Sequence, residues 1–119
     1  MKNLDKKYTH KSHCKGTLAY LIFITKYRKE ILTESYSEDI KQYMYDIANY
    51  YNWIIIVMET EQDHIHLLIQ YPPKECISNI AKILKQQSTW MMWQKYGEYL
   101  KNIYWNQMFF GVMVIFMQV

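Results

Sequence analysis

The alternation of apolar and polar residues along this chain predicts a short series of strands and helices. A continuous apolar run over 17–25, rich in β-forming residues, predicts a buried strand. Ser35 and Glu38 resemble a helical capping box, and the apolar residues that follow recur at helical spacing, so we predict a helix over about 37–51. The residues expected to face inward from this helix are Ile40, Tyr43, Met44, Ile47 and Tyr51.

The next part of the chain predicts two paired strands. Residues 53–60 form a second apolar run of β type, and residues 64–70 alternate apolar and polar side chains until Pro72 and Pro73 end the strand. Only residues 61–63 separate the two runs, which is too short for a crossover helix, so we expect an antiparallel hairpin. The residues of its second strand that should point into the core are Ile65, Leu67 and Ile69.

The remaining pattern predicts a second helix and a fourth strand. Ser78 is the expected N-cap of the helix, Gly97 is its expected break, and residues 104–110 are predicted to be the strand. The residues expected to face inward from the helix are Ile80, Ile83, Leu84 and Met91. The order strand, helix, strand, strand, helix, strand is the split βαβ arrangement of an α+β, ferredoxin-like or palm-type fold. We therefore predict one domain over 1–119, with a mostly antiparallel sheet and both helices on one face.

Composition adds a mild preference for polyanions. The chain has 14 Lys and Arg against 11 Asp and Glu, a net charge of +3, and 12 tyrosines. Basic residues cluster around one aromatic ring in Lys26-Tyr27-Arg28-Lys29, and Lys82 and Lys85 share one face of the second helix. These features suit nucleic-acid binding, but a solvated helix face and ordinary aromatic packing explain them equally well.

Cysteine usage and hydropathy indicate a cellular setting. Cys14 and Cys76 are isolated, without the spacing of a metal site or a disulfide framework, which indicates a reducing, cytoplasmic environment. The polar N-terminal segment does not resemble a signal peptide. No apolar run approaches the ~20 residues that a membrane-spanning helix needs, so we expect no membrane association.

The motif with the most chemical content is His64-Ile65-His66. Side chains of a strand alternate between its faces, so both imidazoles should point the same way, with their Cα atoms roughly 6.5 Å apart. Two rings at that separation can converge on one divalent cation. Two solvated polar residues on a half-exposed strand are the plainer interpretation, and a metal site would need a third ligand from elsewhere.

Three segments together resemble the IS200/IS605-type transposases, the small Y1 enzymes of the HUH nuclease superfamily. The segments are Leu21 to Lys29, Asp63 to Leu68, and Tyr104 to Gln107, and the resemblance runs from about Tyr20 to Phe110. It implies a protein that cuts and rejoins single-stranded DNA at hairpins, commonly as a homodimer. It also implies that His64 and His66 hold Mg²⁺ or Mn²⁺, weakly, while a tyrosine attacks the phosphodiester. The DNA-binding residues expected on this basis are Lys26, Tyr27, Arg28, Lys29, Lys82 and Lys85.

The end of the sequence departs from the family pattern. In the family a final helix carries a Tyr-x-x-x-Gln motif that supplies the nucleophile and a metal ligand, whereas here Val114 stands four residues before Gln118. We therefore expect a truncated chain that lacks this helix, has no identified catalytic residue, and is inactive by itself; Tyr104 is the alternative nucleophile. A non-enzymatic single-strand binder, or an RNA-binding ferredoxin-like module with aromatic residues on its exposed sheet face, are the other functions considered.

Overall fold

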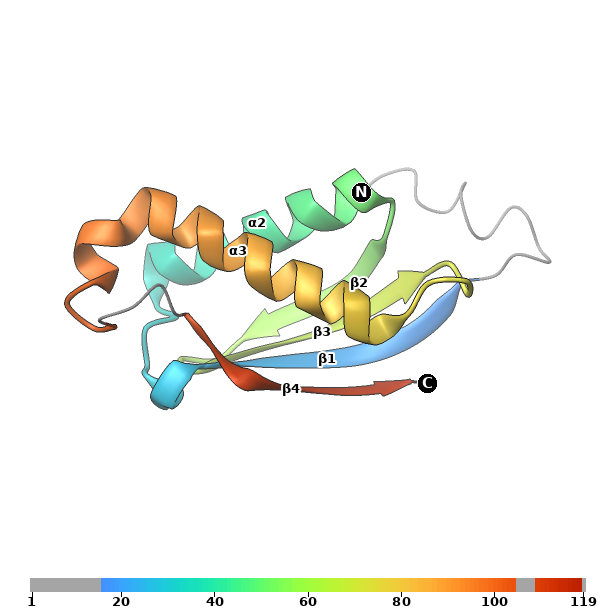
Figure 1. Cartoon of the computed structure of the whole chain (residues 1–119), viewed down its shortest axis with the longest axis horizontal. Helices are drawn as coiled ribbons and strands as arrows, with labels where there is room; N and C mark the ends of the chain where they lie inside the picture. The colour runs from blue at the N-terminus through green and yellow to red at the C-terminus, as the bar shows by residue number, and fades with distance from the viewer. Residues whose placement is uncertain (1–15, 105–108, 119) are drawn as a thin grey trace.

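The computed structural model describes residues 16–104 and 109–118, with only the backbone of 111–118. These residues form a four-stranded antiparallel sheet in the order β2-β3-β1-β4, with two helices on one face (Figure 1). The strands are β1 (Thr17–Thr25), β2 (Ile54–Thr60), β3 (His64–Tyr71) and β4 (Phe110–Gln118); the helices are α2 (Glu34–Tyr51) and α3 (Ile77–Leu100), and a 3-10 turn, η2 (Lys26–Arg28), follows β1. The predicted α+β fold and element order are confirmed.

The two central strands bury every second side chain. On β3 the alternation buries Ile65, Leu67 and Ile69, as predicted, and on β1 it buries Ala19, Leu21 and Phe23. The helices cover this face, so the alternate side chains lie on the other face, which we call the open face. The open face of β1 and β3 carries Leu18, Tyr20, Ile22, Ile24, His64, His66, Leu68 and Gln70.

Helix α2 confirms the predicted periodicity but not the predicted cap. Ile40, Met44 and Ile47 are buried, and Tyr43 and Tyr51 pack at the margin of the core. The helix begins at Glu34 after Thr33, so the expected capping box of Ser35 and Glu38 is wrong because Ser35 already lies within the first turn. The left-handed residue Asn52 ends the helix, and its N–H donates to the carbonyls of Ala48 and Asn49.

Helix α3 also begins earlier than predicted. It starts at Ile77 after Cys76, and the hydroxyl of Ser78, the expected cap, lies 3.0 Å from the sulfur of Cys76 instead. The expected break at Gly97 is a kink at Tyr96 (φ −119°, ψ 26°), after which the helix continues to Leu100. The inward-facing residues are Ile80, Leu84 and Met92, with Ile83 and Met91 partly buried. No helix among the described residues is long and apolar enough to cross a membrane.

The predicted fourth strand over 104–110 is wrong in position. Tyr104 lies in the turn after α3, where its N–H donates to the carbonyl of Leu100, and pairing with β1 begins at Phe110 opposite Thr25. Tyr104 is held at the end of α3, and the carbonyl of Phe109 accepts from the N–H of Lys26, so among the described residues the ladder starts only at Phe110. Residues 105–108, which include most of the Tyr104–Gln107 segment, lie outside the described residues, as does Cys14.

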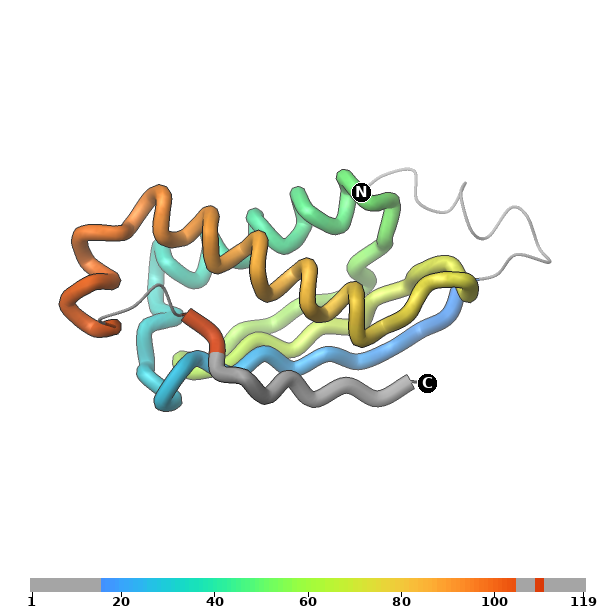
Figure 2. The backbone as a smooth tube through the Cα atoms, in the orientation of Figure 1, coloured from blue at the N-terminus to red at the C-terminus, as the bar shows by residue number. Residues whose placement is uncertain are grey.

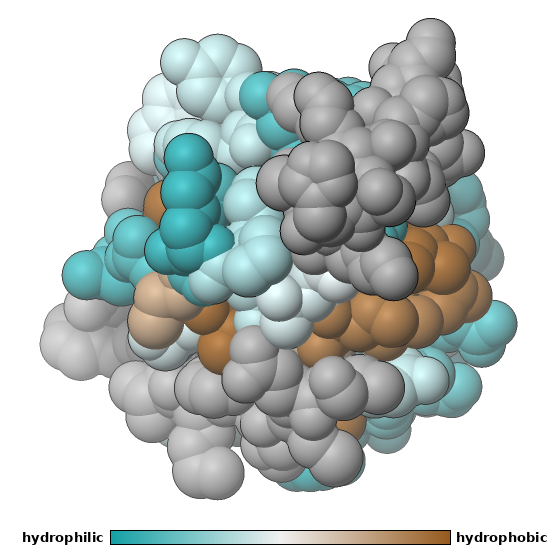
Figure 3. Space-filling view, turned by 90° about the vertical axis from the view of Figure 1, so that its right-hand side faces the viewer, coloured by the Kyte–Doolittle hydropathy of each residue, from teal (hydrophilic) through white to brown (hydrophobic). Residues whose placement is uncertain are grey.

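The path of the backbone brings two distant segments together at one end of the molecule. Figure 2 shows the last turn of α3 and the η2 turn at the same end. The hydroxyl of Tyr104 joins the two, because it donates to the carbonyl of Lys26 at 2.9 Å. At the sheet edge, β2 leaves Ile56 and Val57 about half exposed beside a β-bulge. Figure 3 shows that one end of the molecule carries apolar surface next to hydrophilic surface.

Candidate functional site

The two histidines of β3 lie side by side on the open face. Their ring centroids are 5.7 Å apart with an interplanar angle of 38°, and both side chains are partly buried. On β1 the residues opposite them are Ile24 and Ile22. On β2, Glu59 lies opposite His66. The two imidazoles therefore share one face, as the spacing predicted, and they lie between an apolar row on β1 and a carboxylate on β2.

Asp63 connects His64 to the basic turn. Its Oδ1 lies 2.9 Å from Nδ1 of His64, and its Oδ2 lies 3.1 Å from Nη2 of Arg28. The hydrogen bond from His64 lowers the pKa of the Asp63 carboxyl, and the nearby Arg28 charge acts in the same direction, while partial desolvation opposes both. Asp63 precedes the histidines in the sequence, but the strand pattern does not reveal that Arg28 lies beside it, so no role was predicted for Asp63.

The η2 turn has an unusual backbone. Tyr27 (φ 61°) and Arg28 (φ 52°) both occupy the left-handed region, which costs about 1 kcal/mol or more for each non-glycine residue. Thr25 holds the turn on both sides, because its hydroxyl lies 2.8 Å from the carbonyl of Lys29 and 3.1 Å from that of Asp63. Its N–H also donates to the carbonyl of Asp63 at 2.9 Å. The turn presents the ring of Tyr27 to solvent and directs Arg28 toward Asp63.

The six predicted DNA-binding residues divide into two groups. The turn holds the first group, Lys26, Tyr27, Arg28 and Lys29. The second group lies on α3, where partial burial lowers the pKa of Lys85 and the nearby Lys26 charge lowers it further. Lys82 lies one helical turn earlier and is exposed. Because α3 covers the face opposite the histidines, Lys82 and Lys85 do not share the open face with them. Within the described part of the chain, the turn is the element that brings a basic side chain, that of Arg28, toward the histidines through Asp63.

The donor set fits a weakly held divalent metal and does not complete its coordination. His64 and His66 offer two imidazole nitrogens on one face, and a carboxylate accepts a hydrogen bond from one ring, as is usual for histidine ligands. Over the described residues, no group of three His, Cys, Asp or Glu side chains is close enough to hold an ion. Two nitrogens leave most positions of a Mg²⁺ or Mn²⁺ ion for water, substrate or another ligand.

Two tyrosines near the site differ in how accessible their hydroxyl groups are. Tyr104, the alternative nucleophile, is 1% exposed, and desolvation raises the pKa of its phenol to about 12, so its hydroxyl is neither accessible nor readily ionised. Tyr20 is 47% exposed and lies on the open face, paired with Leu68, two residues along β3 from His66. Sequence reasoning did not single out Tyr20, because its proximity to His66 depends on the register between β1 and β3.

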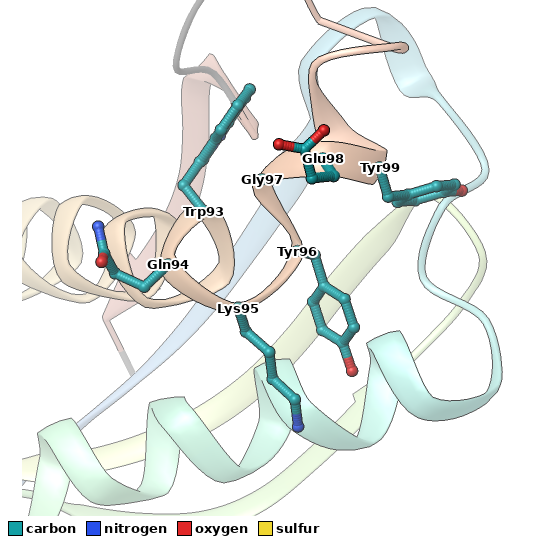
Figure 4. A pocket seen from close by; sticks show the side chains of 7 residues that line it. All are labelled: Trp93, Gln94, Lys95, Tyr96, Gly97, Glu98 and Tyr99. Carbon is teal, nitrogen blue, oxygen red and sulfur yellow. The ribbon is translucent and has the colours of Figure 1, made fainter.

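A separate shallow pocket of about 410 Å³ follows the kink of α3 (Figure 4). Lys95 and Tyr96 point from it toward α2, where both side chains donate to the carboxylate of Asp39, the lysine at 2.8 Å. Tyr99 stacks on Tyr36 with ring centroids 4.7 Å apart. These contacts join the two helices, and the pocket belongs to the helical layer, away from the open face.

Comparisons with known proteins identify the family. The family model described as "Transposase IS200 like" matches residues 14–116. The chain is 33% identical over 87 residues to the ISDra2 transposase TnpA of Deinococcus radiodurans, covering 73% of this chain and 61% of that protein. It is 29% identical over 90 residues to the transposase for insertion sequence element IS200 of Salmonella typhimurium, covering 76% of this chain and 59% of that one. The matches therefore span about three fifths of the relatives' length.

Solved structures agree with the sequence comparison. A crystal structure attributed to a transposase of Deinococcus radiodurans superposes with a TM-score of 0.82 at 25% identity, covering 91% of this chain and 82% of that one. A REP-associated tyrosine transposase bound to a REP hairpin shares the fold, with a TM-score of 0.59 at 11% identity over 89% of this chain and 57% of that one. The extent of the family match and the agreement of fold lead to one conclusion: the chain belongs to the IS200-like transposase family.

Proposed function

We propose that this chain binds single-stranded hairpin DNA and contributes the metal-holding half of a site for strand cleavage and rejoining. The observation that carries the proposal is the pair of histidines on the open face, beside a turn that holds Lys26, Arg28 and Lys29. Under this proposal the neutral imidazoles of His64 and His66 would hold Mg²⁺ or Mn²⁺. When bound, the ion would stabilise negative charge on the oxygens of the scissile phosphate.

The protein's own part in this function is to hold and orient the DNA strand. Lys26 and Lys29 lie at the turn next to His64, where they would neutralise phosphates of a bound strand. The exposed ring of Tyr27 can stack with an unpaired base, and Lys26 Nζ lies 5.4 Å from the centre of that ring. Lys82 and Lys85 would act only if the strand continues around the sheet edge to α3. Because the structurally similar REP-associated transposase is bound to a REP hairpin, a DNA hairpin with single-stranded flanks is the appropriate probe.

The nucleophile is not assigned to Tyr104 in this proposal. Attack requires an accessible phenolate, whereas the buried hydroxyl of Tyr104 donates a hydrogen bond to the carbonyl of Lys26. We infer that the described part of the chain does not cleave DNA by itself, and that assembly as a homodimer accompanies activity. The RNA-module alternative predicts several stacking aromatics on the open face, whereas Tyr20 is the aromatic residue other than the histidines on the described open face of β1 and β3.

The metal part of the proposal is tested by calorimetric titration of the full chain with Mn²⁺. We expect weak binding that is lost in His64→Ala and in His66→Ala. Gln70→Ala is the matched control, because Gln70 is a partly buried polar residue on the same face of the same strand. Equal Mn²⁺ binding by the wild type and both histidine variants would overturn the metal assignment. The substrate class is tested separately, by comparing DNA and RNA hairpins of the same sequence, and tighter binding to the RNA hairpin would overturn it.

A further inference from the structure

The contacts around Asp63 form a continuous chain from the basic turn to the first histidine. Arg28 Nη2 lies 3.1 Å from one carboxylate oxygen of Asp63, and His64 Nδ1 lies 2.9 Å from the other. The backbone of Asp63 is fixed as well, because its carbonyl accepts from the N–H of Thr25 at 2.9 Å. The Asp63 side chain is 19% exposed and that of His64 is 29% exposed, so both groups of this hydrogen bond are largely shielded from water.

The chemistry of the two groups determines which ring nitrogen carries the proton. An ionised carboxylate can only accept hydrogen bonds, so Nδ1 of His64 must be the donor. In a neutral imidazole with Nδ1 protonated, Nε2 holds the free lone pair and is the nitrogen able to bind a metal. By contrast, no described side chain hydrogen-bonds to the ring of His66. Among the described side chains, therefore, one fixes the tautomer of His64 and none fixes that of His66.

We propose that Asp63, itself held by Arg28, is a positioning residue that fixes His64 in the Nδ1–H tautomer and so selects Nε2 as its metal-binding atom. This inference rests on the proposed metal role of His64 and His66. It also gives Arg28 a function other than phosphate binding: its guanidinium holds the carboxylate in the orientation that faces the imidazole. The left-handed backbone at Tyr27 and Arg28 is then the structural requirement for bringing Arg28 back toward Asp63.

The first test examines the tautomer in the metal-free full chain. Long-range ¹H–¹⁵N NMR spectra distinguish a protonated from an unprotonated ring nitrogen, so they report the state of His64 directly. We expect Nδ1–H in the wild type and a shift toward the Nε2–H form in Asp63→Ala. Asp63→Asn, whose amide oxygen can still accept from Nδ1–H, should retain most of the wild-type signal. Asp46→Ala is the matched control, because it removes one carboxylate from the exposed surface of α2.

The second test measures Mn²⁺ affinity on the same variants. Loss of a hydrogen-bond partner of a ligating histidine typically weakens metal binding by about 10–100-fold, so we expect a loss of that order for Asp63→Ala. We expect a smaller loss for Arg28→Ala, and none for Lys74→Ala, which removes an exposed positive charge outside the turn.

The two tests separate the inference from the proposed function. An unchanged His64 tautomer in Asp63→Ala, or unchanged Mn²⁺ affinity despite an altered tautomer, overturns the positioning role while leaving metal binding by the histidines intact. A wild-type chain that binds no Mn²⁺ overturns the metal role itself, and with it the proposed purpose of Asp63, even where the tautomer shifts. Equal losses in Asp46→Ala and Asp63→Ala would show a general charge effect and would also overturn the proposal.

Discussion

Replacing Tyr104 with phenylalanine removes one buried hydroxyl and leaves the ring in place. That hydroxyl donates to the carbonyl of Lys26 at 2.9 Å and lies 3.4 Å from the carbonyl of Phe109. A buried neutral hydrogen bond contributes a net ~1 kcal/mol, and leaving the acceptor poorly satisfied adds to the loss. The Lys26 carbonyl keeps one long contact with the N–H of Lys29 at 3.4 Å, so we expect Tyr104→Phe to lower the free energy of unfolding by about 1–2 kcal/mol at pH 7.

The same hydroxyl makes the difference between the two proteins depend on pH. Burial raises the phenol pKa from 10.0 to about 12 in the folded protein. The unfolded chain then ionises first, so the stability associated with the neutral phenol is fully present below pH 10 and is lost as pH rises toward 12. One pKa unit corresponds to 1.36 kcal/mol, so at pH 11 the wild type should have lost about 1.4 kcal/mol that the variant cannot lose. The advantage of the wild type at pH 7 should therefore largely disappear at pH 11.

Urea unfolding followed by circular dichroism at the two pH values measures this change. The other tyrosines and the lysines titrate in both proteins and cancel in the comparison. Tyr50→Phe is the control, because Tyr50 is 79% exposed and its hydroxyl should contribute little at either pH. A stability difference between wild type and Tyr104→Phe that is the same at pH 7 and pH 11 would refute the assignment of a buried, neutral, hydrogen-bonded phenol.

Three further outcomes follow from the structure. Changing Lys26, Arg28 and Lys29 together to alanine should weaken hairpin binding. It should also reduce the slope of log K against log salt concentration by about 2, since each single-strand phosphate contact contributes roughly 0.7 to that slope. A fluorescence-anisotropy salt series with an unchanged slope would contradict the turn as the DNA surface. Incubation with labelled hairpin DNA and Mn²⁺ should give no covalent adduct on a denaturing gel, and an adduct that disappears in Tyr104→Phe would show that this tyrosine is the nucleophile after all. Asp39→Asn should destabilise the chain at pH 7 but not in acid. Hydrogen bonds from Lys95 and Tyr96 lower the pKa of Asp39 below 3.8, so their stabilising effect is present above that value and is lost as pH falls. Thermal melts from pH 7 to 3 would detect this loss.

The central part of the fold could be predicted because its signals are local. Period-two burial on β1 and β3, and the short connection between β2 and β3, follow from residues that are neighbours in the sequence. The same reasoning put both histidines on one face. Helix starts were less predictable: Ser35 and Ser78 are good capping residues in isolation, yet the chain enters each helix before it reaches them.

What could not be predicted depends on register and on contacts between distant segments. The β1–β3 register puts Tyr20 beside the histidine row, and the left-handed turn brings Arg28 to Asp63, which is 35 positions away in the printed numbering. The misplaced last strand has the same origin: Tyr104 is used to connect α3 with the carbonyl of Lys26, a contact that no sequence periodicity encodes. The site is thus visible from sequence as a pair of ligands, but its supporting residues are not.

The position of β3 within the sheet has a consequence for how the histidines respond to thermal motion. β3 is an interior strand, hydrogen-bonded to β2 on one side and to β1 on the other, whereas β2 and β4 are edges. Amide hydrogens of a doubly paired strand generally exchange with solvent only through large openings, and edge strands fray at lower cost. The spacing of His64 and His66 is therefore preserved while the margins of the sheet open and close. Under the proposed function, the two ligands would already be in place before an ion arrives, because the low-cost openings of the sheet occur at its edges.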